Sequence, residues 1–76
     1  MDNIKQILKN LHPEYDFDSS TNFVEDGFLD SFALTALIAE LDEAFGISID
    51  GLDIVPENFA SWNSILDVVK KNGGNV

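Results

Sequence analysis

The sequence predicts an all-α fold, a small bundle of three main helices plus one short helix. The first reason is that apolar residues recur at the i, i+3, i+4, i+7 spacing of an amphipathic helix in three separate stretches. The second is that apolar and polar residues alternate only around Ile47 and Ile49, and no second such run exists to pair with it as a strand. A helical bundle is therefore the expected architecture.

The first helix is expected over residues 3–12. Its apolar stripe consists of Ile4, Ile7, Leu8 and Leu11. Pro13 ends it, because proline disfavours the helical conformation of the residue before it. The segment 13–29 that follows has no period and is long for a connection in so small a chain, which is typical of a functional loop. Its expected anchors to the core are Phe17, Phe23, Val24, Phe28 and Leu29.

The second helix is expected to begin at Asp30-Ser31 and to end at Gly46. Aspartate and serine are both good N-cap residues, and glycine is the usual C-terminal stop. The apolar stripe between these signals consists of Leu34, Leu37, Ile38, Leu41 and Phe45.

The third main helix is expected to start after Ser61, a good N-cap residue, and to end near Lys70-Lys71, whose charges suit a last turn. Its stripe consists of Trp62, Ile65, Leu66 and Val69. The stretch 56–60 predicts the short helix, because proline suits the first helical position and an acidic residue the first turn. Residues 72–76 are expected to form a loose tail.

Length limits what the chain can do. With 76 residues it is expected to be one domain, residues 1–76, too small to enclose a deep catalytic pocket beside its core. We therefore expect a non-catalytic protein. The predicted core residues are Ile7, Leu8, Leu37, Leu41, Phe45, Ile65, Leu66 and Val69.

The net charge indicates which kinds of partner the protein binds, and the cysteine content indicates its cellular compartment. Fourteen acidic against four basic residues give a net charge of -10, which speaks against binding to nucleic acid and favours partners with basic surfaces. The absence of cysteine indicates a reducing, cytoplasmic compartment. No leader segment or long apolar run is present, so we expect no membrane insertion, and we expect a monomer.

The run Asp26-Gly27-Phe28-Leu29-Asp30-Ser31-Phe32 is the most informative in the chain. One interpretation is structural, since either Asp30 or Ser31 could cap the second helix. The other is that Ser31 carries a covalent phosphate ester, because the positive end of a helix is a natural seat for a phosphate group.

Leu29-Asp30-Ser31-Phe32 resembles the Asp-Ser-Leu attachment motif of acyl carrier proteins, and the resemblance extends over nearly the whole chain. It implies that Ser31 attacks coenzyme A in a phosphopantetheinyl transferase and receives 4'-phosphopantetheine. It also implies that Asp30 helps to hold magnesium in that complex, a role compatible with capping. Phe32 replaces the commonest leucine, and Gly27 lies four residues before the serine, a pattern closer to stand-alone carriers resembling D-alanyl carrier protein.

The resemblance implies a carrier that holds an acyl or aminoacyl group as a thioester, in fatty-acid, polyketide or related biosynthesis. The expected partners are the transferase, an acyl- or aminoacyl-activating ligase, and acyl-transferring enzymes with basic docking surfaces. Phe32 is out of phase with the buried stripe and is expected to be an exposed docking residue. The acidic residues expected to steer partners are Asp26, Asp30, Glu40, Asp42 and Glu43.

The sequence suggests three other interpretations. The spacing of Asp16, Asp18, Ser20 and Asn22 suggests a calcium-binding EF-hand loop, but Thr21 occupies its glycine position and Gly27 its bidentate glutamate position, so no metal site is predicted. The single histidine, His12, is a poor candidate base for a serine hydrolase. An unmodified acidic module that binds a basic protein surface remains the alternative to a carrier.

Overall fold

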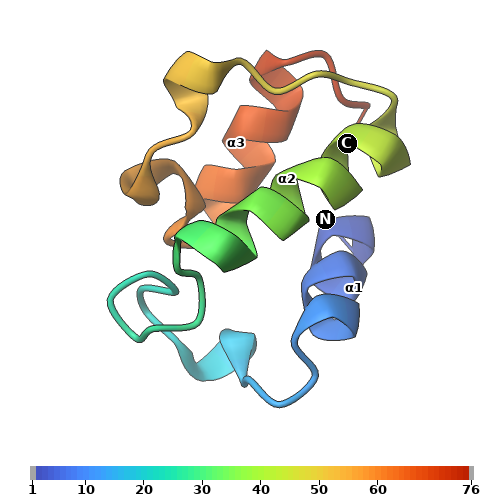
Figure 1. Cartoon of the computed structure of the whole chain (residues 1–76). Coiled ribbons are helices and arrows are strands. Elements are labelled where there is room, and N and C mark those ends of the chain that lie inside the picture. The colour runs from blue at the N-terminus through green and yellow to red at the C-terminus, as the bar shows by residue number, and fades with distance from the viewer. Residues whose placement is uncertain (1, 76) are drawn as a thin grey trace.

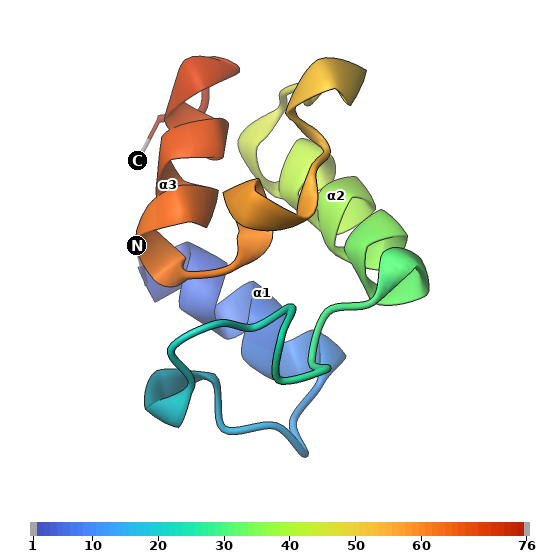
Figure 2. The same cartoon turned by 90° about the vertical axis from the view of Figure 1, so that its left-hand side faces the viewer.

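The computed structural model, which describes residues 2–75, contains all three predicted main helices (Figure 1). They are α1 (Asp2–Leu11), α2 (Ser31–Phe45) and α3 (Trp62–Lys71), with the short 3-10 helices η1 (Phe17–Ser19), η2 (Gly51–Asp53) and η3 (Pro56–Phe59) between them. Helix α1 packs against both α2 and α3, and η3 packs against α3 (Figure 2). The all-α prediction is confirmed. No strand forms within residues 2–75, so the Ile47–Ile49 alternation is not a strand.

Capping residues explain where α2 and α3 begin, and a glycine explains where α2 ends. The Asp30 carboxylate accepts a hydrogen bond from the Ala33 amide at 2.8 Å, and the Ser61 hydroxyl oxygen accepts one from the Ser64 amide at 3.2 Å. Gly46 ends α2 in the left-handed region, with φ 63°, as a C-terminal glycine does. The short helix predicted over 56–60 is η3, which ends one residue earlier.

Replacement of Gly46 by alanine is expected to lower the free energy of unfolding by about 1 kcal/mol, because an L-residue is strained at a positive φ. No atom would clash with the added Cβ, so steric overlap does not contribute to the loss. The matched control is Gly51→Ala, where space is also open and φ is not left-handed, and where no loss is expected. Urea denaturation compares the two variants, and equal losses would contradict the assignment of strain to Gly46.

An aromatic cluster holds the long segment between α1 and α2 against the bundle. The ring of Phe17 lies edge-on to Phe23, with centroids 5.1 Å apart, and 5.9 Å from Trp62 of α3. The Phe23 amide also donates to the Ala60 carbonyl oxygen at 2.8 Å. Of the five predicted anchors, Phe17, Phe23 and Leu29 are buried, whereas Val24 and Phe28 are half-buried. The segment is thus fixed at one end of the bundle.

The core differs in part from the one predicted. Five predicted members are buried: Leu8, Leu37, Leu41, Ile65 and Val69. Ile7, Phe45 and Leu66 are only half-buried and pack on the margin of the core. Ile4, Phe59 and Val68 fill the interior instead, and all three are almost fully buried.

A group of polar residues, here named the polar clasp, fastens η2 to the end of α3. Lys71 Nζ lies 2.8 Å from Asp53 Oδ1, and Asn72 Nδ2 donates to Asp53 Oδ2 at 3.2 Å. The Asn72 side chain also accepts from the Asp50 amide at 3.0 Å, which completes the clasp of Asp50, Asp53, Lys71 and Asn72. The tail predicted to be loose over 72–76 therefore begins with hydrogen-bonded residues, while Val76 lies outside the described residues.

The clasp predicts a pH dependence of stability. Hydrogen bonds from Lys71, and then from Asn72, hold the pKa of Asp53 below its ordinary 3.8. A carboxyl group with a lowered pKa stabilises the fold above its unfolded-state pKa, and this contribution is lost as the pH falls through the folded-state pKa. Asp53→Asn is thus expected to lower the urea midpoint at pH 7, and this deficit is expected to shrink as the pH falls below about 4.

The control for Asp53→Asn is Asp67→Asn, which makes the same charge change at an exposed position of α3. It is expected to change the midpoint little at either pH, as surface substitutions usually do. A deficit of Asp53→Asn that stays constant from neutral to acid pH would show that the charge of Asp53 does not contribute.

Candidate functional site

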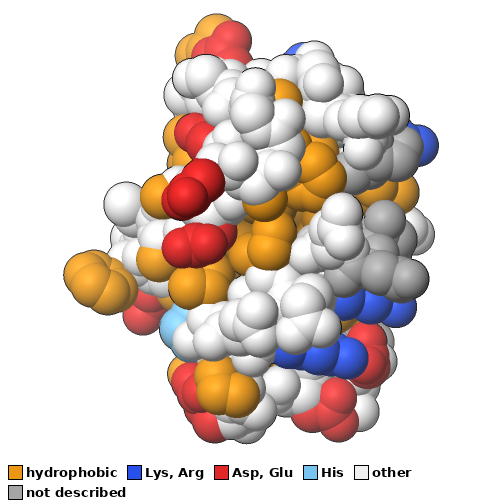
Figure 3. Space-filling view, turned by 90° about the vertical axis from the view of Figure 1, so that its right-hand side faces the viewer, with side chains coloured by type: hydrophobic (Ala, Val, Ile, Leu, Met, Phe, Trp, Pro, Cys, Tyr) orange, Lys and Arg blue, Asp and Glu red, His pale blue; other side chains and the backbone are white. Residues whose placement is uncertain are grey.

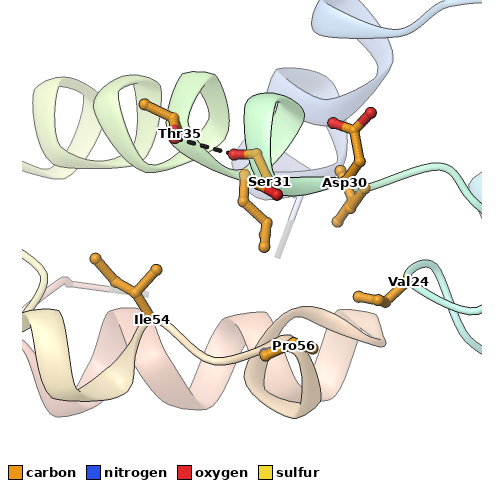
Figure 4. A pocket seen from close by; sticks show the side chains of 8 residues that line it. Val24, Asp30, Ser31, Thr35, Ile54 and Pro56 are labelled. Atoms are coloured by element: carbon orange, nitrogen blue, oxygen red, sulfur yellow. Dashed lines mark hydrogen bonds between the residues drawn. The ribbon is translucent and has the colours of Figure 1, made fainter.

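Ser31 is the first residue of α2 and its side chain is exposed. The sequence allowed either Asp30 or Ser31 as the N-cap of α2. In the structure Asp30 is the N-cap, so the Ser31 hydroxyl is not used for capping. The Ser31 carbonyl oxygen accepts a hydrogen bond from the Thr35 hydroxyl at 3.0 Å (Figure 4). The arrangement places a primary hydroxyl in solvent at the positive end of a helix of 15 residues.

A groove with a volume of about 560 Å³ opens beside Ser31. One wall belongs to α2, where Leu34 and Thr35 follow Ser31, and the other comes from Ile54 and Pro56, which Figure 4 shows on the opposite side. The remaining lining residues are Val24, Leu29 and Asp30. The lining is mostly apolar, so the groove combines an accessible hydroxyl with a surface suited to an apolar group.

The other predicted site residues on α2 do not line the groove. Phe32 is 85% exposed and lies next to Ser31 in the chain, though it does not line the groove. Glu40 and Glu43 are exposed farther along α2. Asp42 is half-buried and accepts a hydrogen bond from the Ile49 amide at 3.0 Å, a structural role that the sequence analysis did not foresee.

Charge is unevenly distributed over the surface. In Figure 3 several acidic side chains follow one another along one edge of the face, next to apolar atoms. The lysine side chains in the lower part of the view lie toward the other edge, where they adjoin further acidic side chains. Two of the four lysines form ion pairs within residues 2–75, since Lys9 lies 3.2 Å from Asp18 and Lys71 lies 2.8 Å from Asp53. The hydrogen bond from Lys9 holds the pKa of Asp18 below its usual value. Asp26, beyond the groove, accepts a hydrogen bond from the Ser20 hydroxyl.

The acidic loop with EF-hand spacing does not converge on one point. Asp16 accepts a hydrogen bond from the Ser19 hydroxyl, whereas Asp18 pairs with Lys9. Across the part of the chain that the structure describes, no cluster of three or more acidic or histidine side chains could hold a metal ion. His12 stacks on Tyr15 and faces the Glu14 carboxylate at 3.3 Å.

Comparison with known families agrees with this geometry. A family described as "Phosphopantetheine attachment site" matches residues 2–70, and the chain belongs to this family. Members carry 4'-phosphopantetheine covalently and act as carriers, so the chain is a phosphopantetheine carrier of the acyl carrier protein type. The sequence shows no significant similarity to the curated proteins or to the solved structures with which it was compared.

Within residues 2–75 no helix is long and apolar enough to cross a membrane.

The residues present fit the group that the family carries. A phosphate ester needs an accessible hydroxyl, and the exposed Ser31 at the helix N-terminus supplies one in a favourable field. The second wall of the groove, formed by Ile54 and Pro56, is not predicted by the sequence patterns. Ile54 precedes η3 and Pro56 is its first residue, and neither belongs to one of the periodic apolar stripes.

Proposed function

We propose that the protein carries an acyl or aminoacyl group as a thioester on a 4'-phosphopantetheine arm attached to Ser31. The observation that supports this most directly is the exposed Ser31 hydroxyl at the mouth of an apolar groove, in a chain that matches the family over residues 2–70. The arm supplies the thiol on which the carried group is held. The protein supplies the attachment point, the groove and the acidic surface.

The chain's own residues have distinct roles in loading. Within a phosphopantetheinyl transferase, Ser31 Oγ attacks the phosphorus of coenzyme A that bears the pantetheine arm. The P–O–P bond breaks, adenosine 3',5'-bisphosphate leaves, and a base of the transferase takes the hydroxyl proton. Asp30 fixes the start of α2 through its hydrogen bond to Ala33, and its second carboxylate oxygen is available for the magnesium ion of that complex. Phe32, Glu40 and Glu43 are exposed for docking on the same helix.

The proposed partners, besides the transferase, are an acyl- or aminoacyl-activating ligase and acyl-transferring enzymes with basic docking surfaces. A net charge of -10 supports such partners, and the absence of cysteine supports a cytoplasmic setting. Gly27 and Phe32 depart from the commonest pattern around the attachment serine, and this departure supports a stand-alone carrier. The group that it carries is of the fatty-acyl, polyketide or D-alanyl type. An unmodified acidic binding module is the second candidate, and the same charge supports it.

The test is intact-mass spectrometry of the purified protein after incubation with coenzyme A, magnesium and a broad-specificity phosphopantetheinyl transferase. One phosphopantetheine is expected on the wild-type chain and none on Ser31→Ala. If the wild-type chain stays unmodified also with the transferase of its own source organism, the acidic binding module is the better description.

A further inference from the structure

The polar clasp contains a pair of residues with a chemistry of its own. Asn72 is followed by Gly73, and it is the only asparagine of the chain that has glycine after it. In such a pair the backbone nitrogen of the glycine attacks the side-chain amide carbon of the asparagine, because glycine has no Cβ to restrict the approach. The resulting succinimide is opened by water, and the asparagine has lost its amide. The sequence therefore favours spontaneous deamidation at this position.

The folded protein holds the Asn72 side chain away from this reaction. Asn72 Oδ1 accepts a hydrogen bond from the Asp50 amide at 3.0 Å. Asn72 Nδ2 donates to the Val68 carbonyl oxygen at 2.9 Å and to Asp53 Oδ2 at 3.2 Å. Both polar atoms of the side-chain amide are thus engaged, and rotation of the side chain toward the Gly73 nitrogen would break all three hydrogen bonds.

The backbone that follows Asn72 is held as well. The Gly73 amide donates to the Lys70 carbonyl oxygen at 3.1 Å, and the Gly74 amide donates to the Val69 carbonyl oxygen at 2.8 Å. The attacking nitrogen must give up its proton, which in the fold is hydrogen-bonded inside the protein. The reacting carbon and the reacting nitrogen are therefore both fixed, and the reaction requires a local opening of the chain.

Conversion of Asn72 would undo the polar clasp. A carboxylate has no hydrogen to donate to Asp53, and it places a like charge beside the Asp53 carboxylate. Asp53 also holds the segment that follows it, because its carbonyl oxygen accepts from the Val55 amide at 3.0 Å and from Asn58 Nδ2 at 2.8 Å. Loss of the clasp would therefore loosen the segment that forms the wall of the groove opposite Ser31.

We propose that Asn72 is a deamidation site that the closed polar clasp protects, and that its conversion releases η2 from the end of α3. The reaction forms a bond between Gly73 N and Asn72 Cγ and breaks the bond between Cγ and Nδ2. The proton of the Gly73 amide passes to solvent base, and Nδ2 leaves as ammonia. Water then opens the succinimide at either carbonyl and leaves an aspartyl or isoaspartyl residue. This inference does not depend on attachment at Ser31.

The experiment measures the deamidation rate of the whole chain in mildly alkaline buffer. Peptide mass spectrometry after proteolysis locates the mass gain of an amide-to-acid conversion at Asn72. We expect folded wild-type protein to react at least about tenfold more slowly than the same chain in guanidinium chloride. Lys71→Met removes the ion pair of the clasp and is expected to accelerate the folded protein roughly threefold.

The matched control is Lys70→Met, the same change at the neighbouring lysine, which is exposed and outside the clasp. It is expected to react at the wild-type rate, after the rate of each folded variant is divided by its own rate in guanidinium chloride. Equal rates in the folded and denatured wild-type chain would refute protection. Failure of Lys71→Met to accelerate the reaction, or equal acceleration by Lys70→Met, would refute the role of the clasp.

The release of η2 is tested on the deamidated protein, which its additional negative charge separates from the unmodified protein by anion exchange. Hydrogen-exchange mass spectrometry compares the two forms. Residues 51–58 are expected to exchange faster after deamidation, whereas α1, which does not contribute to the clasp, is expected to exchange as before. Unchanged exchange over residues 51–58 would refute the release of η2.

Discussion

Ser31→Ala is expected to keep its unmodified mass under conditions that load every wild-type molecule, while its free energy of unfolding changes by less than about 0.5 kcal/mol. The reason for the first result is that the variant lacks the hydroxyl oxygen on which we propose that the phosphate ester forms. The reason for the second is that Asp30, and not Ser31, caps α2. Intact-mass spectrometry and urea denaturation on the same preparation test both parts.

Two substitutions of Asp30 serve as the controls for Ser31→Ala. Asp30→Ala removes the cap and is expected to lower the free energy of unfolding by about 1 kcal/mol. Asp30→Asn keeps a good capping group but removes the carboxylate charge, so stability is expected to remain while loading slows if Asp30 contacts the magnesium ion. Loading of Ser31→Ala in the same assay would disprove attachment at Ser31.

Phe17→Ala is expected to have the largest effect on stability, a loss of about 3–5 kcal/mol in the free energy of unfolding. Phe17 is 1% exposed and its ring contacts those of Phe23, Phe28 and Trp62. Its truncation would leave a cavity where the segment between α1 and α2 meets α3. A small domain has a total stability of only about 5–15 kcal/mol, so a large fraction of the molecules would unfold near 37 °C.

The matched control is Phe32→Ala, the same truncation at a side chain that is 85% exposed. It is expected to change the free energy of unfolding by less than about 0.5 kcal/mol. Urea denaturation followed by circular dichroism compares the two variants. Similar losses in both would mean that burial does not set the contribution of these rings.

The three main helices were predictable because their signals are local. The apolar spacing around Leu37 and Ile65, and the capping residues Asp30, Gly46 and Ser61, lie within the helices or next to them. The core was predicted less well, because the choice between Ile7 and Ile4 depends on how α1 rotates against its neighbours. The short helices η1 and η2 were not predicted, since contacts with distant residues hold them.

In the candidate site, too, the residues with local signals were predicted and those that depend on distant contacts were not. The placement of Ser31 at the start of α2 follows from adjacent residues and was predicted. The opposite wall from Ile54 and Pro56 depends on the path of the chain between α2 and α3, which apolar periodicity does not describe. The structural role of Asp42 was missed as well, because its partner Ile49 belongs to that same irregular stretch.

The position of Trp62, the single tryptophan of the chain, has a practical consequence. Its indole ring meets Phe17 and Phe23 from the segment before α2, and Lys5 Nζ of α1 lies 5.6 Å from the ring centroid. Three parts of the chain therefore converge on one fluorophore that does not line the groove beside Ser31. Its emission provides an intrinsic optical signal for the assembly of α1, the intervening segment and α3.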